Sequence, residues 1–408
     1  MRILILNQYC TPEPNFKSVP FARELIRRGH EVCILTGFPN YPGGKLYPGY
    51  RQRWRQRETL DGVPILRIPY FISHDRSGLR RMVTYGSFAL AATGPLLFGW
   101  KPDLIYVWHL VPTGLAAALA GSCRRVPFVI DIQDLWPDAV LHSGMGHPCM
   151  RRALHAACNL VYRCAARVVV LSPGFKQRLI ERGVPPAKID LIYNWCDEFN
   201  LLQTPQKPAD DVRQVFSGHF NILFAGMMNH AQGLDAVFAA AASLSVNHPQ
   251  IQFVFMGGGS EVERLRQKAG IVSPTNTRFL PRCSSSEAAG ITSMADAMLV
   301  HLRKDPLFTI TIPSKIGACL AMAKPILIGV QGDASDLVLR AGAGITCEPE
   351  SPASIADAAV RMSELPTAAR TEMGRSGAAF YRRELSLSTG VDRFESLFQR
   401  VLTEQKSS

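Results

Sequence analysis

Short β-rich runs alternate with longer helical stretches along almost the whole chain, and the alternation comes in two successive series. The first series has apolar runs at 3–6, 31–36, 65–68, 104–107, 128–132, 168–171 and 189–192. The second has them at 220–225, 252–256, 277–280, 297–300, 325–329 and 344–347. Strands that alternate with helices favour a doubly wound parallel sheet. The sequence therefore predicts an α/β protein with two Rossmann-like domains.

The length supports the same division, because 408 residues exceed what one compact core usually holds. Between the two series, residues 203–211 read QTPQKPADD, a polar and proline-bearing stretch typical of a linker. We therefore expect an N-terminal domain at 1–200 and a C-terminal domain at 201–385. A last helix within 386–408 is expected to return to the N-terminal domain.

The net charge of +12, with a sequence pI near 9.4, indicates an anionic partner. Nucleic acid, an anionic lipid surface and a phosphorylated small molecule would all fit. The chain has no run of five Lys and Arg residues and no zinc-finger or RNA-recognition signature, so no nucleic-acid partner is expected. Its ten cysteines form no C-x-x-C pair, which is typical of reduced, mostly buried thiols in a cytoplasmic protein.

One uncharged segment, Met82–Trp100, follows Arg80 and Arg81 and precedes Lys101. Its length would just span a bilayer, but its glycines and Pro95 argue against spanning. A buried helix of the first domain and a helix lying on an anionic membrane surface are the two other interpretations. We expect a protein peripheral to the inner face of the cytoplasmic membrane.

No cofactor motif follows the first strand, where a nicotinamide enzyme would carry G-x-G-x-x-G. Residues 7–14 contain no glycine, and Gly257-Gly258-Gly259 after a later strand reads best as a tight turn. No D-x-D motif occurs near a strand end. We therefore expect neither a cofactor nor a metal site.

Several longer motifs occur in a fixed order: PEP at 12–14, RGHEV at 28–32, LTGFPNYP at 35–42, DIQDLWP at 131–137, YNWCD at 193–197, AQGL at 231–234 and IPSKI at 312–316. Together they resemble the GT-B fold, family 4 of retaining glycosyltransferases. Within that family they are similar to the transferases of O-antigen and capsule assembly that act with N-acetyl-L-fucosamine or N-acetylquinovosamine.

The resemblance implies two Rossmann-like domains facing a deep cleft and a metal-independent reaction. It also implies a UDP-sugar donor, specifically an N-acetylated deoxyhexosamine, and an undecaprenyl-diphosphate-linked saccharide as acceptor. In retaining enzymes of this fold the leaving phosphate is thought to take the acceptor proton, so the protein needs no strong base. Its task is to position the acceptor and to stabilise phosphate charge.

A donor site is expected where a loop of the second domain enters a helix, because free amides and the helix dipole there favour an anion. Lys315 would add a point charge, unless it is a solvated cation and Ser314 only a helix cap. Each arginine or lysine after a strand would reach the phosphates, unless it is a plain surface residue. The predicted donor-binding residues are Gly226, Asn229, Gln232, Gly233, Arg282, Arg303, Lys304, Ser314 and Lys315.

The first domain is expected to hold the acceptor. The predicted catalytic residues, which follow strands and would orient the acceptor hydroxyl, are Asp131, Gln133, Asp134 and His109. The predicted acceptor-binding residues are Glu13, Asn40 and Tyr41. A helix-capping role for Asp131 and core packing of Tyr41 are the competing interpretations.

The pattern departs from the family at several positions. Many family 4 enzymes carry two glutamates near the donor, where this chain has Ile310 and Ala318, and a first-domain histidine, where it has Gln133. Two alternatives to a transferase therefore stay open. One is a nucleotide-sugar epimerase on the same fold, and the other is a catalytically silent scaffold of a polysaccharide assembly complex.

Overall fold

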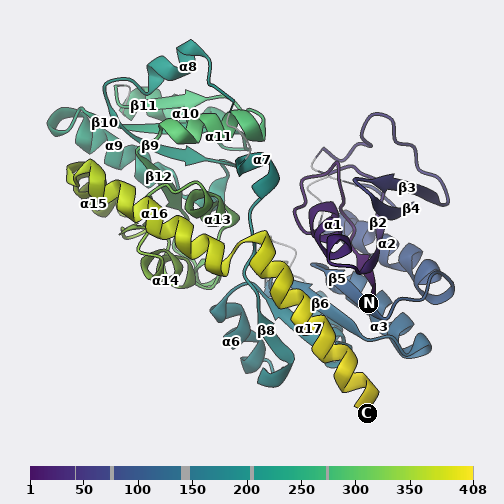
Figure 1. The fold of residues 1–408 in the computed structure, drawn as a ribbon. Helices are drawn as coiled ribbons and strands as arrows, with labels where there is room; N and C mark the ends of the chain where they lie inside the picture. Colours follow the sequence, from purple (N-terminus) through teal and green to yellow (C-terminus); the bar gives the residue numbers. More distant parts are fainter. Residues whose placement is uncertain (42, 74–77, 139–147, 203–205, 273–274, 408) are drawn as a thin grey trace. The chain divides into compact units, whose positions relative to one another are not determined.

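A computed structural model describes the chain except for residues 42, 74–77, 139–147, 203–205, 273–274 and 408 (Figure 1). The chain forms two compact units. Unit 1 comprises Met1–Tyr193 and Gly390–Ser408, and unit 2 comprises Asn194–Thr389. The first division therefore falls before the predicted 200/201, and the second after the predicted 385/386. Residues 203–205 of the expected linker lie outside the described residues, and its remaining part, 206–211, leads into the short helix α8 of unit 2.

Unit 1 is built on an eight-stranded sheet with the order β3-β4-β2-β1-β5-β6-β7-β8. All pairs are parallel except β3 with β4, which form an antiparallel edge. The chain winds outward from β1 on one side and resumes beside it with β5, so the sheet is doubly wound, as predicted. The strands are β1 (Arg2–Leu6), β2 (Glu31–Gly37), β3 (Gln56–Leu60), β4 (Val63–Ile68), β5 (Leu104–Trp108), β6 (Phe128–Ile132), β7 (Arg167–Val170) and β8 (Ile189–Leu191).

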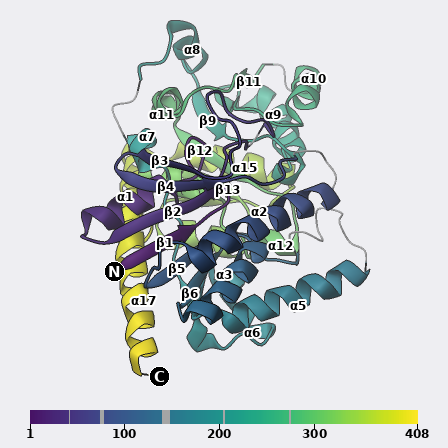
Figure 2. The ribbon, with the colours of Figure 1, turned by 90° about the vertical axis from the view of Figure 1, so that its right-hand side faces the viewer.

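Helices cover both faces of this sheet. On one face the aromatic rings of Phe21, Tyr106 and Phe394 pack against one another at centroid distances of 5.2–5.3 Å. On the other face α2, α3 and α5 lie side by side, with Gly114 of α3 close to Ile130 (Figure 2). The helices are α1 (Val19–Arg27), α2 (Gly78–Phe98), α3 (Val111–Arg124), α5 (Pro148–Cys164), α6 (Pro173–Glu181) and the 3-10 turn η1 (Pro186–Lys188).

Unit 2 is built on a six-stranded, fully parallel sheet with the order β11-β10-β9-β12-β13-β14. Its strands are β9 (Phe220–Ala225), β10 (Ile251–Met256), β11 (Thr277–Leu280), β12 (Ala297–His301), β13 (Ile326–Gly329) and β14 (Gly344–Thr346). Its helical elements are α7 (Glu198–Leu202), α8 (Asp210–Val215), η2 (His230–Gln232), α9 (Asp235–Asn247), α10 (Val262–Val272), α11 (Ser285–Met294), α12 (Pro306–Thr309), α13 (Ser314–Ala321), α14 (Asp333–Arg340), α15 (Pro352–Glu364) and α16 (Thr367–Glu384).

The continuous apolar runs of the sequence became central strands because both of their faces are covered. Every residue of β10 is buried, and Phe238, Phe255 and Phe279 form an aromatic stack at its core face. A parallel strand covered by helices on both sides has no solvent face that would require polar residues. For this reason the strand predictions agree with the structure to within one or two residues.

Two elements do not follow from the sequence pattern. Strand β3 reads QRETL and lies at the sheet edge, so packing does not require apolar residues there. Helix α16 is mainly polar, and its buried side combines Gly374, Gly377 and Ala378 with Phe380 and Tyr381. A Cβ on Gly374 would collide with Ala323, and one on Gly377 with Ala343. The expected burial of cysteines also holds only in part, because Cys123 and Cys164 are exposed.

The uncharged segment forms most of α2 and presents apolar residues on two sides. Phe88, Ala92 and Leu96 are buried, whereas Leu90 and Phe98 are 78% and 86% exposed. Among the described residues no helix meets the length and hydropathy that crossing a bilayer requires. The spanning interpretation is therefore wrong, and α2 is a packed helix of unit 1 with an exposed apolar side.

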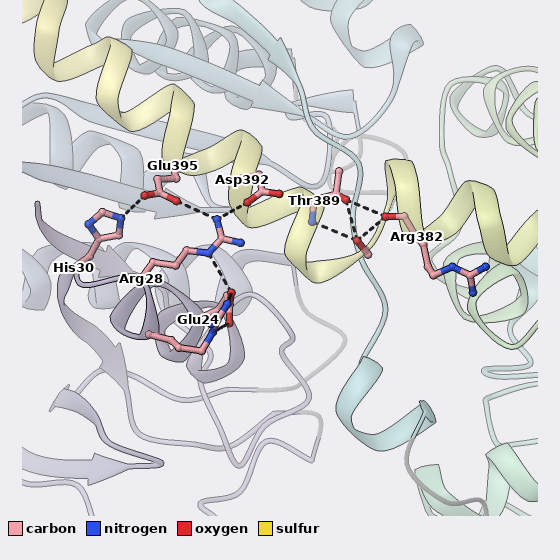
Figure 3. Close-up of polar contacts among 9 residues, drawn as sticks. Glu24, Arg28, His30, Arg382, Thr389, Asp392 and Glu395 are labelled. Atoms are coloured by element: carbon pink, nitrogen blue, oxygen red, sulfur yellow. Dashed lines mark hydrogen bonds and ion pairs between the residues drawn. The ribbon is translucent and has the colours of Figure 1, made fainter.

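The last helix, α17 (Leu387–Ser407), returns to unit 1 from Gly390 onward, as expected. Its carboxylates meet basic residues at the end of α1: Arg28 bonds Asp392 and lies 3.0 Å from Glu395, and His30 lies 2.9 Å from Glu395 (Figure 3). Its apolar side is fully buried against the sheet through Phe394 and its neighbours. The helix is thus part of the core of unit 1.

We predict that Phe394→Ala lowers the free energy of unfolding of unit 1 by about 3–5 kcal/mol, because it leaves a cavity in a closed aromatic cluster. Urea unfolding followed by tryptophan fluorescence measures this effect, since Trp54, Trp100, Trp108 and Trp136 all lie in unit 1. Phe98→Ala, at a position that is 86% exposed, is the matched control and is expected to change stability by less than about 0.5 kcal/mol. An equal effect of both changes would contradict the packing role of α17.

Candidate functional site

The predicted donor residues of unit 2 gather where parallel strands end. β9 and β12 are adjacent in the sheet, although β10 and β11 lie between them in sequence, so the strand order reverses at this point. Loops that follow such neighbouring strands diverge and leave a crevice for ligands. Gly226 follows β9 directly, Arg303 and Lys304 follow β12, and Arg282 follows β11.

The loop after β9 is held by close backbone packing against the triple glycine. A Cβ on Gly257 would lie 2.1 Å from the carbonyl oxygen of Gly226, and one on Gly259 equally close to that of Met228. Gly257 and Gly259 also have φ angles of 138° and 145°, which side chains disfavour. The triple glycine is therefore a tight turn, as predicted, whose additional role is to let two loops touch.

This packing uses several of the main-chain amides that were expected to bind an anion. The N–H groups of Gly226 and Met228 donate to the carbonyls of Met256 and Gly258, at 2.9 and 2.7 Å. Those of Gln232 and Gly233 donate within the 3-10 turn η2. The expected cradle of free amides is thus smaller than the sequence suggested.

Lys315 lies over this loop and supplies a partly buried cation. Its Nζ donates to Oε1 of Gln232 at 2.8 Å and lies 3.9 Å from the ring centre of Phe224. A Cβ built on Gly226 would lie 3.7 Å from the same Nζ. Burial lowers the pKa of Lys315 to about 8, because the ammonium has lost much of its hydration. These contacts favour a role in the site over that of a freely solvated cation.

The neighbouring Ser314 does not cap a helix. The N-cap of α13 is Pro313, and Ser314 is the exposed first residue of the helix. Asn229 and Arg282 are likewise exposed, and Arg282 has no ion pair within the described part of the chain. These three side chains remain available to a ligand.

The two basic residues after β12 are engaged by acidic residues of the same unit. Arg303 lies 3.1 Å from Glu350 and contacts His230, and Lys304 lies 2.7 Å from Glu348. Both basic side chains remain partly exposed. Their charge is largely balanced, so they offer less to a diphosphate than Lys315 does.

His301, at the end of β12, is a component that the sequence analysis missed. It is fully buried, its Nδ1–H donates to the carbonyl of Gln232 at 2.6 Å, and its Nε2 accepts from the N–H of Glu350 at 3.1 Å. Burial lowers its pKa, which agrees with a neutral ring that donates once and accepts once. Gly233 packs on it, since a Cβ there would lie 3.2 Å from the ring. His301 thus positions the turn that carries Gln232.

In unit 1, Asp131 is the centre of a closed polar cluster. Lys17 Nζ and Tyr106 Oη both donate to its Oδ2 at 2.6 Å, and Gln133 Nε2 donates to its Oδ1 at 2.6 Å. Lys17 and Asp131 have no exposed side-chain surface. Burial lowers the pKa of Lys17 and raises that of Tyr106. Asp131 is therefore neither a helix cap nor a group that touches the acceptor, and we reassign it as a positioning residue.

Two predicted acceptor residues are also structural. Glu13 is 3% exposed and accepts the N–H groups of Cys10, Asn40 and Tyr41 at 2.7–2.9 Å. Burial raises its pKa, and these three hydrogen bonds oppose that shift. Asn40 is fully buried and donates to the carbonyl of Phe38 and to Tyr70. Glu13 therefore clamps two loops together, and neither side chain is open to an acceptor.

The remaining predicted residues of unit 1 do reach the surface at the carboxyl end of its sheet. His109 Nε2 lies 3.2 Å from Oδ2 of Asp134, whose side chain is 57% exposed. The N–H of His109 donates to the carbonyl of Asp131 at 2.9 Å. Tyr41 is 43% exposed and packs on Tyr9 at a centroid distance of 5.3 Å, so it is not a core residue. The structure thus brings a His–Asp pair directly above the buried cluster.

Two family models match the chain. The first, described as a glycosyl transferase 4-like domain, matches residues 20–195, and the second, described as glycosyl transferases group 1, matches residues 219–364. Each match falls on one of the two series of strands. With this fold, the chain belongs to the GT-B glycosyltransferases of family 4.

Curated relatives and solved structures agree with this family. The putative colanic acid biosynthesis glycosyl transferase WcaI of Escherichia coli K12 is 27% identical over 311 residues, which cover 73% of this chain and 75% of WcaI. The probable glycosyltransferase WbjE of Pseudomonas aeruginosa is 23% identical and covers 68% of this chain and 70% of its own. Anabaena HepE in complex with UDP matches at a TM-score of 0.70 and 15% identity, covering 98% of this chain and 100% of HepE.

We predict that Lys17→Met and Asp131→Asn each destabilise unit 1 by about 3–5 kcal/mol, because each leaves one charged or polar partner buried without its counterpart. The double variant is expected to lose less than the sum, since it removes both charges together. Urea unfolding of the parent, the two single variants and the double variant measures this coupling. Strictly additive losses would contradict a direct interaction between the two groups.

Proposed function

We propose that this protein is a retaining glycosyltransferase that moves an N-acetylated deoxyhexosamine from a UDP-sugar to a lipid-linked saccharide during bacterial surface polysaccharide synthesis. The observation that carries the proposal is the Lys315 ammonium, partly buried over Gly226 and bonded to Gln232. A partly desolvated cation at the ends of parallel strands is electrostatically suited to a diphosphate.

Known proteins of this fold support the choice of a nucleotide sugar and of a polysaccharide product. HepE was solved with UDP and also with UDP-glucose. The name of WcaI assigns it to colanic acid biosynthesis. The N-acetylated sugar and the undecaprenyl-diphosphate carrier rest on the motif resemblance alone and form the most specific part of the proposal.

In the proposed reaction, the C1–O bond to the diphosphate breaks while the acceptor oxygen bonds to C1 on the same face. The acceptor proton passes to an oxygen of the leaving phosphate, so no protein base is consumed. Lys315 stabilises the charge that develops on the diphosphate. The partly buried His109 and the exposed Asp134 orient the acceptor hydroxyl, and the buried Asp131 cluster holds Gln133 and the His109 backbone.

A lipid-linked acceptor calls for a protein that works at a membrane surface. The net charge of +12 and the exposed Leu79, Leu90 and Phe98 of α2 support this location. We therefore propose that the protein binds peripherally to the inner face of the cytoplasmic membrane.

The decisive experiment incubates the purified protein with UDP-sugars and an undecaprenyl-diphosphate-linked saccharide and follows the product by mass spectrometry. Transfer from an N-acetylated deoxyhexosamine donor supports the proposal, and UDP binding without transfer from any donor contradicts it. Turnover of the UDP-sugar without acceptor would favour the epimerase. No UDP binding at millimolar concentration would favour the scaffold, which Ile310 and Ala318 suggest.

We predict that Lys315→Ala weakens UDP binding by about 1.5–3 kcal/mol, the range for a charge-assisted hydrogen bond. Isothermal titration calorimetry measures the change. Lys207→Ala, which removes an exposed lysine of the same unit, is the matched control and should bind UDP as the parent does. Unchanged affinity of the Lys315 variant would remove this residue from the donor site.

We also predict that UDP affinity falls as the pH rises above 8. The pKa of Lys315 is lowered to about 8, so its charged form, which binds the diphosphate, is depleted above that pH. The affinity should be flat near pH 7 and fall by up to about tenfold per pH unit beyond the pKa. Titrations between neutral and alkaline pH measure the profile, and Lys315→Ala should lack the step. An identical profile in that variant would assign the step to another group.

A further inference from the structure

A row of exposed arginines leads into the edge strand β3 of unit 1. Arg51, Arg53, Arg55 and Arg57 are all exposed, and none forms an ion pair with a described residue. Trp54, in the middle of this row, is 82% exposed. By contrast, Arg67 of the neighbouring strand is fully buried and bonds Glu58 at 2.6 Å. The arginine row is thus not explained by the fold.

A cavity of about 410 Å³ lies behind two of these arginines. Arg55 and Arg57 line it together with Ile65 and Leu66 of β4, and Pro95 of α2 and Trp100 just after that helix also contribute. The carboxylate of Glu58 is part of the lining as well, and its charge is balanced by Arg67. The cavity therefore combines guanidinium groups with apolar walls. Such a lining suits a ligand with an anionic head and an apolar body.

The arginines are not needed to neutralise the end of α2, because another residue does so. Arg124 donates from Nη1 to the carbonyl of Leu96 at 2.7 Å and from Nη2 to that of Gly99 at 3.0 Å. These bonds satisfy the carbonyls that a helix C-terminus leaves free. Arg55 and Arg57 therefore keep their hydrogen-bonding capacity for a ligand.

Exposed apolar side chains flank the cavity from both elements. Trp54 directly precedes the lining residue Arg55, and Phe98, 86% exposed, directly precedes Gly99, which also lines the cavity. Leu90 continues the exposed apolar side along α2 at 78% exposure. Aromatic residues next to basic ones are typical of side chains at a membrane interface.

We infer that this β3–α2 surface, made of Arg51, Arg53, Trp54, Arg55, Arg57 and Phe98, binds an anionic phospholipid. The cavity takes the headgroup, whose phosphate Arg55 and Arg57 hold, and Trp54 and Phe98 insert between the lipids. Charge complementarity selects the anionic lipid, and the exposed apolar residues separate a lipid from a purely polar partner such as an acidic protein. The inference refines the peripheral membrane binding of the proposed function, and it is independent of the donor site.

The test measures co-sedimentation of the full-length protein with phosphatidylcholine vesicles that contain or lack phosphatidylglycerol. The double variant R55A/R57A should bind the anionic vesicles roughly 30-fold more weakly, since each arginine near the surface contributes about 1 kcal/mol. R151A/R152A removes two exposed arginines of α5 and is the charge-matched control, expected to change binding by less than about threefold. If both double variants lost vesicle binding equally, the loss would follow from the lower net charge alone, and the inference would be overturned.

A second variant tests the cavity without changing any charge. Thr59 is exposed on β3 and lines the cavity, so Thr59→Trp should fill it. We expect this variant to lose binding of soluble short-chain phosphatidylglycerol by about tenfold or more, as measured by calorimetry. Binding equal to that of the parent would show that no headgroup enters the cavity.

UDP titrations of the same samples keep the two proposals apart. R55A/R57A and Thr59→Trp should bind UDP as the parent does, because these positions lie in unit 1 and Lys315 lies in unit 2. A parent protein that binds anionic vesicles but no UDP would refute the proposed function and leave the lipid surface standing. A parent protein that binds UDP but no anionic vesicles would refute the lipid surface and leave the donor site standing.

Discussion

The buried ion pair between Lys17 and Asp131 is the interaction on which the architecture of unit 1 depends. Two full charges without solvent exposure are tolerated only when their partners are complete. Tyr106 and Gln133 complete them, and Phe394 of the last helix lies against Lys17, with the ammonium 5.1 Å from its ring centre. The pair therefore joins the first loop, two central strands and the C-terminal helix. It also fixes the backbone of Asp131, to which the N–H of His109 donates.

In unit 2, Lys315 differs from the other basic residues of the site in that no carboxylate balances its charge among the described contacts. Arg303 and Lys304 are balanced by Glu350 and Glu348, whereas Lys315 donates to the neutral amide of Gln232 and lies over the ring of Phe224. An ammonium kept short of water and of carboxylates gains most when an anion arrives. The lowered pKa of Lys315 and its suitability for a diphosphate thus have the same physical cause.

Some elements of the fold and of the site could be predicted from the sequence, and others could not. The apolar runs were located correctly because parallel strands covered on both faces leave a strong local pattern. Strand β3 was not predicted because an edge strand needs no such pattern. Helix α16 was not predicted because it is mainly polar and part of its buried side consists of Gly374 and Gly377. Of the predicted site, the Gly226 loop, Gln232 and Lys315 are adjacent in the structure, but Glu13, Asn40 and Asp131 are buried. A sequence motif indicates that a residue belongs to the site. It does not distinguish a residue that contacts the substrate from one that supports the site from within the protein.

The sequence by itself determined the class of fold, the two series of strands, the return of the last helix and the family, because these follow from local periodicity and from ordered motifs. Only the tertiary structure decided which polar residues are closed within the protein and which remain open. Lys17 and Asp131 lie 114 positions apart, and Lys315 and Gln232 lie 83 apart. Partners at such separations leave no local trace in the chain, since burial and charge pairing arise only when the strands and helices pack.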